Sequence, residues 1–386
     1  MKKTKKQWLA LVSAGVMALS TSSCSTFAGL FGEKDEPIIL KNVTQAKNVI
    51  LMIGDGMGPE QILAGEVFKG EPLTMQGFPY QTKVETCSMS SSITDSAAAA
   101  TALATGVRTV NGKVGQNARE QDLETIVDIA HGLGKRTGVI ATEEIYGATP
   151  MGFSGHASSR EDKNTLVASA VASSNVNLFI SSAISYAYQQ EFLDGGYAQI
   201  KTIDEISEAT GEKLYGSYAI DATAQSMSAE AGVGALDRIV TEALDYLSKD
   251  EDGFFLMTEG SHIDHGGHNN DLCYMLEELI AFDDAVQAVL EWAKDRDDTV
   301  VIVTADHETG GFTFDSGTSH EKLVEVYEAD GEGDCYEWTT TSHTGVDVNL
   351  YINGADIDFA NYSFENSERI KNTDVFQIMK YLLTGK

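Results

Sequence analysis

Short apolar runs rich in β-branched residues alternate along this chain with longer segments of helical periodicity. The runs that we interpret as buried strands lie at residues 48–53, 136–141, 177–180, 254–258, 299–304 and 348–352. Apolar residues recur with helical spacing at residues 231–247, 271–296 and 374–383. This alternation is typical of a mostly parallel sheet covered by helices on both faces, so we expect an α/β fold.

The chain is long enough to build one large core. It has 386 residues, of which 42% are apolar, and no Pro-rich or Ser-rich linker divides it. We therefore expect a single folded region over residues 47–386. Residues 186–230 and 310–342 fit the strand-helix alternation poorly, and we predict that they are surface insertions.

The first 23 residues have the pattern of a secretory signal. Four lysines at positions 2 to 6 precede an uncharged segment whose apolar centre is too short to span a bilayer. Cys24 follows small residues, which resembles the site where bacterial lipoproteins are cleaved and acylated. We predict an exported protein of the periplasm or cell envelope, anchored in the outer membrane through Cys24, with residues 24–46 as a polar tether. Soluble secretion remains the alternative.

The charge balance restricts the ligands that the protein can bind. With 58 acidic and 27 basic residues, the net charge is −31. Such a surface repels nucleic acid, which excludes nucleic-acid binding as the main role. It also repels phosphorylated molecules, so an anion site here needs local positive charge such as metal ions.

Three cysteines follow Cys24 in the chain, namely Cys87, Cys273 and Cys335. A disulfide between Cys273 and Cys335 is possible in an oxidising compartment, but the sequence favours free thiols.

Acidic residues follow three of the predicted strands directly. Asp55 comes after residues 48–53, Glu259 after 254–258 and Asp306 after 299–304. In open parallel sheets, ligands gather at the carboxyl ends of the strands. We therefore expect three carboxylates at one edge of the sheet, although Gly54-Asp55-Gly56 is also good turn chemistry.

Histidines are concentrated beyond Glu259. Residues 259–268 contain three of the eight histidines together with two acids. Imidazole and carboxylate are zinc ligands, and one turn of chain can present Asp264 and His268 together. Because the glycines at 266 and 267 weaken a helix, a loop is equally compatible. A solvated polar loop explains the polarity but not the number of histidines, so we favour a metal site.

Two more histidines are candidate ligands. His307 follows Asp306 at the end of a buried strand, where adjacent side chains can reach two partners. The alternative is a turn with a surface histidine. His343, taken alone, is more simply explained as a structural residue, and only the set makes it a ligand candidate.

Ser96 precedes a run of alanines, which predicts a helix that begins at this serine. The N-terminus of a helix offers unpaired backbone N–H groups and attracts anions, so the Ser96 hydroxyl is a candidate nucleophile there. Asp95 and Ser96 could equally be no more than helix caps.

Arg160 is the basic residue that we select as an anion ligand. A guanidinium group offers a planar pair of donors to two oxygens of a phosphate or carboxylate. The alternative is an ordinary surface arginine.

Taken together, these residues resemble the motifs of the alkaline phosphatase family, from about Lys47 to the C-terminus. The matching motifs, in chain order, are Gly54-Asp55-Gly56-Met57-Gly58, Thr94-Asp95-Ser96-Ala97-Ala98, Ala148-Thr149-Pro150 with Arg160, Glu259-Gly260 with Ile263-Asp264 and His268, Ala305-Asp306-His307, and His343-Thr344-Gly345. The resemblance implies an α/β/α sandwich with two zinc ions and one magnesium ion at the carboxyl edge of the sheet.

The resemblance also implies a role for each residue. Asp264, His268 and His343 would hold the first zinc, and Asp306, His307, Asp55 and the Ser96 oxygen the second. Thr149, Glu259 and Asp55 would hold magnesium. Ser96 would be the nucleophile, Arg160 would bind the phosphoryl oxygens, and Asp95 would orient Arg160.

The implied activity is hydrolysis of small phosphate monoesters through a phosphoserine. A phosphodiesterase or sulfatase of the same superfamily and a non-catalytic anion-binding lipoprotein are the alternatives, and a homodimer remains open. Two positions depart from the family pattern. Gly147 stands where bacterial members carry Asp and animal members His, so it cannot hold a water of the magnesium shell. His265 stands where the same bacterial members carry Lys.

Overall fold

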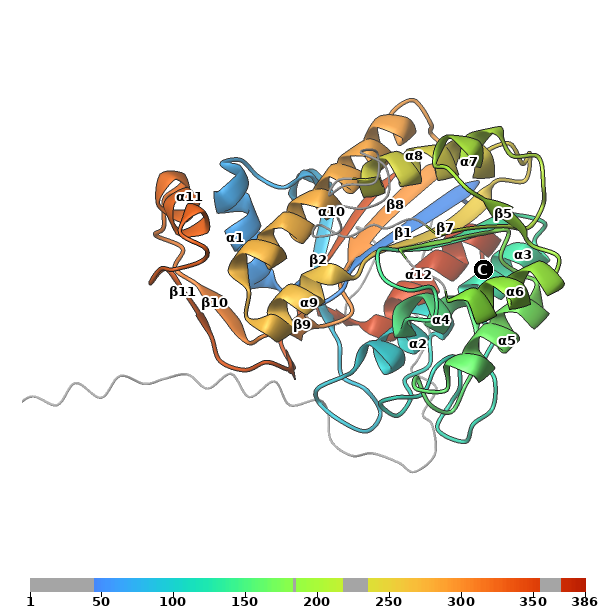
Figure 1. Cartoon of the computed structure of the whole chain (residues 1–386), viewed down its shortest axis with the longest axis horizontal. Helices are drawn as coiled ribbons and strands as arrows, with labels where there is room; N and C mark the ends of the chain where they lie inside the picture. Colours follow the sequence, from blue (N-terminus) through green and yellow to red (C-terminus); the bar gives the residue numbers. More distant parts are fainter. Residues whose placement is uncertain (1–44, 183–184, 218–234, 355–368) are drawn as a thin grey trace, which may run out of the picture.

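A ten-stranded sheet forms the centre of the computed structural model, which describes residues 45–182, 185–217, 235–354 and 369–386. The strand order is β14-β2-β13-β8-β1-β7-β3-β4-β6-β5 (Figure 1). Neighbouring strands run parallel, except that β13 is antiparallel to both β2 and β8. The strands are β1 (Asn48–Gly54), β2 (Tyr80–Glu85), β3 (Arg136–Ala141), β4 (Leu178–Ser181), β5 (Ala198–Ile200), β6 (Leu214–Ser217), β7 (Phe254–Gly260), β8 (Thr299–Thr304), β13 (Val348–Gly354) and β14 (Arg369–Lys371).

Helices cover both faces of this sheet (Figure 1). One layer contains α1 (Pro59–Lys69), α8 (Ala235–Leu247), α9 (His262–Asn269) and α10 (Leu272–Ala293). The other contains α2 (Ser96–Thr105), α3 (Ile126–Gly132), α4 (Ala148–Ser154) and α12 (Asn372–Thr384). The smaller helices α5 (Lys163–Ser173), α6 (Tyr186–Asp194), α7 (Asp204–Glu208) and α11 (His320–Glu328) pack against these layers or each other, and η1 (Thr74–Gly77) is a 3-10 turn against α10. The predicted α/β/α sandwich is confirmed.

The predicted strands are confirmed, with small shifts at their ends. Every residue of β1, β7 and β8 is buried, which is why these strands are visible in the sequence as continuous apolar runs. The sequence analysis missed β2, whose residues are mostly polar and which lies between β13 and β14 near the sheet edge. Only one of its residues, Val84, is buried, so its apolar signal is weak.

The two segments expected as surface insertions differ from each other. In the first, β5 and β6 add two parallel strands to the sheet beside β4, so this part extends the sheet instead of lying apart on the surface. Strand β5 has only three residues and β6 only four, too few for a clear pattern. In the second, α11 and the small sheet of β10 (Phe312–Phe314) and β11 (Tyr336–Trp338) lie at the periphery (Figure 1).

The folded region begins slightly before Lys47. Gln45 Nε2 donates to the Leu383 carbonyl and Ala46 N to the Leu382 carbonyl, which attaches the start of the fold to α12. The predicted signal segment, Cys24 and residues 24–44 of the tether lie outside the described residues. None of the helices described is both long and apolar enough to cross a membrane.

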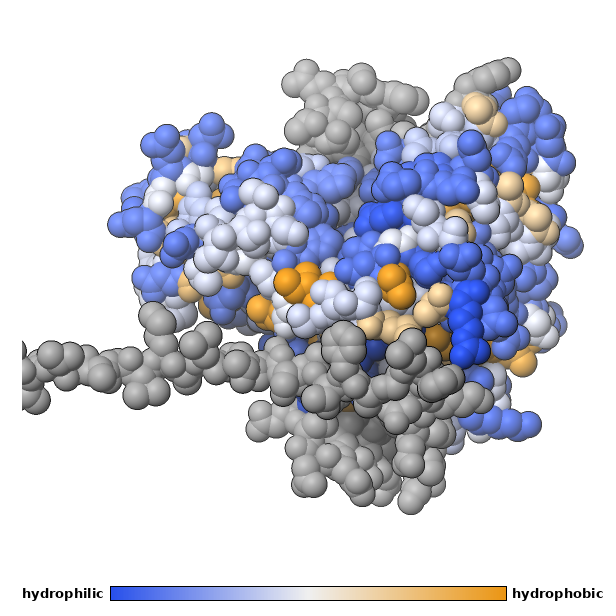
Figure 2. Space-filling view, turned by 90° about the horizontal axis from the view of Figure 1, so that it is seen from below, coloured by the Kyte–Doolittle hydropathy of each residue, from blue (hydrophilic) through white to orange (hydrophobic). Residues whose placement is uncertain are grey.

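The surface is predominantly hydrophilic on the face that Figure 2 shows, where apolar residues form only small patches among the described atoms. This agrees with a chain in which 22% of residues are charged. Cys273 and Cys335 are free thiols in the structure, so the disulfide considered between them is not formed.

Candidate metal centre

The three strand ends bring their carboxylates to one edge of the sheet, as the sequence predicts. Residue Ile53 of β1 pairs with Glu259 of β7 on one side and with Thr304 of β8 on the other. Asp55 and Asp306 therefore each lie two residues beyond this pair of neighbouring residues, at the same edge of the sheet. Asp55 is 5% exposed, Glu259 0% and Asp306 1%, so all three acids are buried together.

Asp55, Asp306 and His307 form the first cluster, which we call the Asp306 group. One potential ligand atom from each lies within 4.8 Å of the other two. The His307 Nε2 is 3.1 Å from Asp306 Oδ2 and 3.6 Å from Asp55 Oδ1. The backbone N–H groups of Gly56 and His307 both donate to Asp306 Oδ1, which fixes this carboxylate and leaves Oδ2 directed at the cluster. Such a set of oxygen and nitrogen ligands suits zinc.

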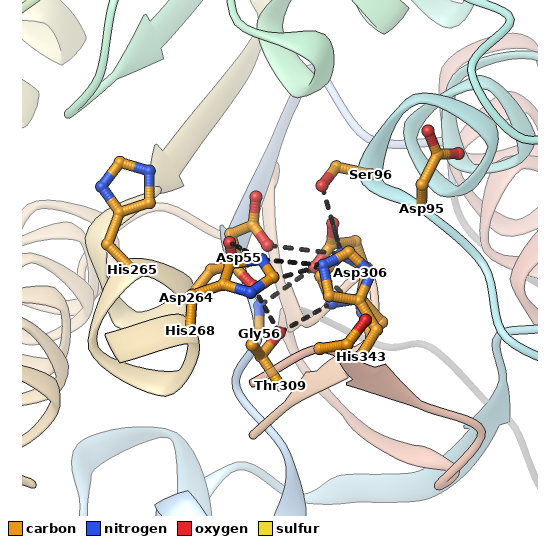
Figure 3. A network of polar contacts seen from close by, with 12 residues as sticks. Asp55, Gly56, Asp95, Ser96, Asp264, His265, His268, Asp306, Thr309 and His343 are labelled. Atoms are coloured by element: carbon orange, nitrogen blue, oxygen red, sulfur yellow. Dashed lines mark hydrogen bonds and ion pairs between the residues drawn. The ribbon is translucent and has the colours of Figure 1, made fainter. Parts of the chain in front are cut away.

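Asp264, His268 and His343 form the second cluster, the Asp264 group (Figure 3). His268 Nε2 lies 3.2 Å from Asp264 Oδ2 and 3.2 Å from His343 Nε2. The other ring nitrogens are held from behind, because His268 Nδ1 is 2.7 Å from the Thr341 carbonyl and His343 Nδ1 is 2.9 Å from the Thr94 carbonyl. Both Nε2 atoms are thereby oriented into the cluster as metal ligands require.

The ligands of the Asp264 group come from a helix and from a short strand pair. The sequence left helix or loop open for residues 259–268, and the structure has α9 there. Its glycines follow from close packing, since a Cβ at Gly266 would lie 2.7 Å from Met275 and one at Gly267 2.9 Å from Thr309. The short strand β12 (His343–Thr344) pairs with β9 (Glu308–Thr309), directly after His307. This pairing brings the isolated His343 to the sheet edge.

The two groups are adjacent. The rings of His307 and His343 stack with centroids 3.5 Å apart. Thr309 links the groups, because its hydroxyl donates to Asp264 and lies 3.2 Å from His307 Nδ1. The arrangement therefore provides two neighbouring ligand sets that share one buried polar network.

Ser96 begins α2 and faces the Asp306 group (Figure 3). Its Oγ lies 3.2 Å from His307 Nε2, and the residue is 4% exposed. The whole of α2 is buried, so its alanines let the helix N-terminus lie close to the ligand clusters. Asp95 is the N-cap and accepts a hydrogen bond from Ala98 N. The capping interpretation is thus correct for Asp95 while the Ser96 hydroxyl remains directed at the candidate ligands.

Asp95 also contacts the predicted anion ligand. Its Oδ2 accepts a hydrogen bond from Gly112 N at 2.9 Å and lies 3.4 Å from Arg160 Nη1. The Arg160 side chain is 32% exposed, so it is neither a free surface group nor fully buried.

Asp55 and two further oxygen-bearing side chains, Thr149 and Glu259, are the residues that the resemblance implies for magnesium, and we call them the Glu259 group. Thr149 lies on α4 and is 1% exposed. Thr149 Oγ1, both Glu259 carboxylate oxygens and Asp55 Oδ1 are buried without a hydrogen-bond partner among the described residues. Leaving such groups unpaired costs about 1–3 kcal/mol each, and more for charged groups. A hard cation such as Mg²⁺ would satisfy these oxygens, so the residues fit the implied metal.

Burial raises the pKa of the carboxyl groups at this edge because it disfavours their charged forms. Asp306 and Asp264 raise the pKa of Asp55 further, and Glu143 does the same to Glu259. Burial, followed by the charge of Asp264, raises the pKa of Asp306 to about 7. Bound cations would stabilise the charged carboxylates and so lower these pKa values again.

The pKa values of His268 and His307 shift in opposite directions, and that of Asp264 is linked to that of His268. Burial opposes ionisation of Asp264, but hydrogen bonding to His268 and the nearby imidazoles lower its pKa. The same hydrogen bond raises the pKa of His268 to about 9. Burial, followed by the charge of His343, lowers the pKa of His307 well below its usual value. His307 is therefore neutral at neutral pH, the form that binds a metal.

The metal-free protein should lose stability as the pH rises from about 4 to about 7. Asp306 has an ordinary pKa of 3.8 and a folded-state pKa of about 7, so the folded state binds this proton more tightly than the unfolded state does. The resulting stabilisation is complete below about pH 4 and is lost as the pH passes 7, an effect on the order of 4 kcal/mol.

Calorimetry of chelated protein from pH 5 to pH 8 measures this slope, and the Asp306→Asn variant should flatten it because the amide does not titrate. Zinc and magnesium should raise the Tm most at the upper end of this range. A difference between the two proteins that does not change with pH would contradict the account.

Two polar residues of the centre escaped the sequence analysis. Thr309 and Glu143 both follow predicted strands, which is the signal that could have found them. Glu143 comes two residues after β3, at the same edge as Glu259, and burial raises its pKa to about 7. His265 stands apart from the two ligand groups (Figure 3).

The family model of alkaline phosphatase matches this chain over residues 46–227 and 190–336. Alkaline phosphatase 4 of Bacillus subtilis is 33% identical over 330 residues, which cover 80% of this chain and 71% of the relative. The alkaline phosphatase of Escherichia coli is 32% identical over 330 residues, covering 68% of this chain and 70% of the relative.

Solved structures show the same likeness. A cold-active alkaline phosphatase from Shewanella sp. superposes with a TM-score of 0.74 at 26% identity, covering 87% of this chain and 99% of the other. The alkaline phosphatase of the Antarctic bacterium TAB5 also gives 0.74, at 28% identity, covering 88% of this chain and 98% of the other. A variant of the TAB5 enzyme was solved with magnesium bound.

Proposed function

The chain belongs to the alkaline phosphatase family, and on this basis we propose that it hydrolyses small phosphate monoesters to an alcohol and inorganic phosphate, with Ser96 as nucleophile. The observation that carries the proposal is the position of Ser96 Oγ, buried at the start of α2 and 3.2 Å from His307 Nε2. A serine that only capped the helix would not need to face a cluster of metal-type ligands.

The three residue groups differ in the metal that they suit. The Asp264 group and the Asp306 group combine imidazole with carboxylate, and we assign one zinc ion to each, with Ser96 Oγ joining the Asp306 group. The Glu259 group offers only oxygen atoms, which suits magnesium. Asp55 belongs to both the Asp306 group and the Glu259 group, and it would connect them.

The reaction has two displacements. Ser96 Oγ attacks phosphorus in line, a phosphoserine forms and the alcohol leaves. Water then attacks the phosphoserine, which releases inorganic phosphate and restores Ser96, so the configuration at phosphorus is retained. When bound, the zinc ions supply the Lewis acidity that lowers the pKa of a hydroxyl group and stabilises charge on the leaving oxygen.

The residues of the chain position the reactants for both displacements. The N-terminus of α2 directs its N–H groups at the phosphoryl oxygens. Asp95 holds Arg160 in place through the 3.4 Å contact between Oδ2 and Nη1. Arg160 then binds two phosphoryl oxygens as a planar pair of donors, which stabilises the charge that phosphoryl transfer spreads over them.

Replacing Arg160 by alanine should weaken substrate and phosphate binding by about 10-fold to 100-fold, the value of hydrogen bonds to a charged group. We expect a raised KM and a raised inhibition constant for inorganic phosphate. Arg119→Ala removes an exposed arginine and is the matched control, which should leave both constants unchanged. If Arg160→Lys has the KM and inhibition constant of the wild type, the positive charge alone accounts for binding, and the proposed planar pair of hydrogen bonds to two phosphoryl oxygens is wrong.

The proposal is tested with p-nitrophenyl phosphate and bis(p-nitrophenyl) phosphate, before and after chelation. We expect the monoester to be hydrolysed much faster, activity to disappear with the chelator, and zinc with magnesium to restore it. Faster diester hydrolysis would support a phosphodiesterase instead. Phosphate binding without turnover in either metal would indicate an anion-binding protein.

We also propose that the protein is exported and anchored through a lipid on Cys24, as the N-terminal sequence indicates. Mass spectrometry of the mature N-terminus tests this, because a lipid-modified Cys24 and a free N-terminus after cleavage have different masses. The oligomeric state in solution, monomer or homodimer, is measured in the same preparation by light scattering.

A further inference from the structure

Position 147 has no side chain, yet its backbone does not require glycine. Gly147 is the N-cap of α4, two residues before Thr149, with φ −57° and ψ 159°. Any residue can adopt this conformation. The reason for glycine must therefore lie in the space around it.

That space is filled by Glu143. A Cβ at position 147 would lie 1.8 Å from Glu143 Oε1 and 2.6 Å from its Cδ. The Glu143 carboxylate thus occupies the volume into which a side chain at position 147 would extend. A carboxylate therefore lies where a side chain at position 147 would lie, although it belongs to Glu143.

Glu143 reaches this place from the carboxyl end of β3. Ala141 of β3 pairs with Glu259 of β7, and Glu143 follows two residues later. The Glu143 side chain is 19% exposed, and no hydrogen bond to its carboxylate is formed within the described part of the chain. Its Oε2 lies 3.9 Å from His265 Nε2, which is too far for a hydrogen bond.

The neighbouring Glu259 group gives separate evidence for a bound cation. Thr149 and Glu259 are at most 1% exposed, and Thr149 Oγ1 and both Glu259 carboxylate oxygens have no partner among the described residues. A further carboxylate beside them adds repulsion unless a cation is shared. A hard divalent cation with oxygen ligands balances both acids.

We propose that Glu143 supplies an anionic oxygen to the coordination shell of the magnesium ion held by the Glu259 group, in place of the side chain that position 147 lacks. The inference rests on the proposed magnesium site. Glu143 positions the ion or its water and does not contact the reacting phosphorus.

The test measures Mg²⁺ binding to zinc-loaded protein by titration calorimetry, with metal content determined alongside. In Glu143→Gln the Mg²⁺ dissociation constant should rise by about 10-fold to 100-fold, as for other outer groups of metal sites, while two zinc ions remain bound. Glu144→Gln is the matched control, because it removes the same charge from the adjacent, exposed residue and should not change Mg²⁺ binding. Wild-type Mg²⁺ affinity in Glu143→Gln would overturn the proposal.

A double variant, Glu143→Ala with Gly147→Asp, checks the spatial argument. It removes the blocking carboxylate and places another at position 147, so Mg²⁺ affinity should recover relative to Glu143→Ala alone. Equal Mg²⁺ affinities in these two variants would overturn the claim that the Glu143 carboxylate takes the place of a side chain at position 147.

These outcomes separate this inference from the proposed function. A wild-type protein that hydrolyses monoesters with zinc but binds no Mg²⁺ would refute the magnesium site and this inference, and would leave the proposed monoester hydrolysis standing. Mg²⁺ binding that depends on Glu143 in a protein without monoester turnover would refute the proposed function alone.

Discussion

The Ser96→Ala variant is expected to lose monoester turnover by a factor on the order of 10⁴ to 10⁶, as removal of a catalytic nucleophile does in other hydrolases. The reason is that in the proposed mechanism Ser96 Oγ displaces the alcohol, and the structure shows this atom buried and 3.2 Å from His307 Nε2. The zinc content should stay near wild type, because every other ligand remains. Steady-state kinetics with p-nitrophenyl phosphate and elemental analysis of the same sample measure both quantities.

Ser154→Ala is the matched control for this variant. Ser154 is also buried, and it ends α4, where its hydroxyl donates to the Pro150 carbonyl at 2.8 Å. Its loss should leave turnover within a few-fold of wild type. A Ser96→Ala protein that keeps a tenth or more of the wild-type rate would show that another group is the nucleophile.

The His307→Ala variant is expected to lose one zinc ion per molecule and turnover on the order of 10³-fold. His307 contributes the imidazole nitrogen of the Asp306 group, which we propose holds one zinc ion, and it also contacts Ser96. A metal ion supplies several kcal/mol of charge stabilisation, and each 1.36 kcal/mol corresponds to a factor of about ten. Metal content and turnover, measured after dialysis against limiting zinc, give the two values.

His343→Ala and His320→Ala complete this comparison. His343 belongs to the Asp264 group, so its loss should remove the other zinc ion. His320 lies on the peripheral α11, where its Nδ1 is 3.1 Å from the Val67 carbonyl, and its replacement should change neither metal content nor turnover. Two zinc ions retained in His307→Ala would contradict the ligand assignment.

The central strands could be predicted because they are buried on both faces. All residues of β1, β7 and β8 are buried, so the centre of each gives a continuous apolar run in the sequence. Strands β2, β5 and β6, which lie at or near the sheet edges, could not be predicted, because β2 and β5 have one buried residue each and β6 has only four residues. Their pairing depends on contacts with distant parts of the chain, which one sequence does not display.

Some residues of the candidate site could likewise be predicted from the sequence, and others could not. Asp55, Glu259 and Asp306 were predictable because strand ends converge at one edge of a parallel sheet. His343 could be selected only as one of the set of candidate ligands, since its position depends on the pairing of β12 with β9. Glu143 was missed because the sequence shows an absent side chain at Gly147 and cannot show that a residue four positions earlier fills the space.

The most direct test of the whole account is to trap the covalent intermediate. The zinc-loaded protein is mixed with p-nitrophenyl phosphate, quenched in acid, digested and analysed by mass spectrometry. The account predicts a single phosphoryl group on Ser96, absent from chelated protein and from Ser96→Ala. A phosphoryl group on another residue, or continued turnover with none at Ser96, would contradict it.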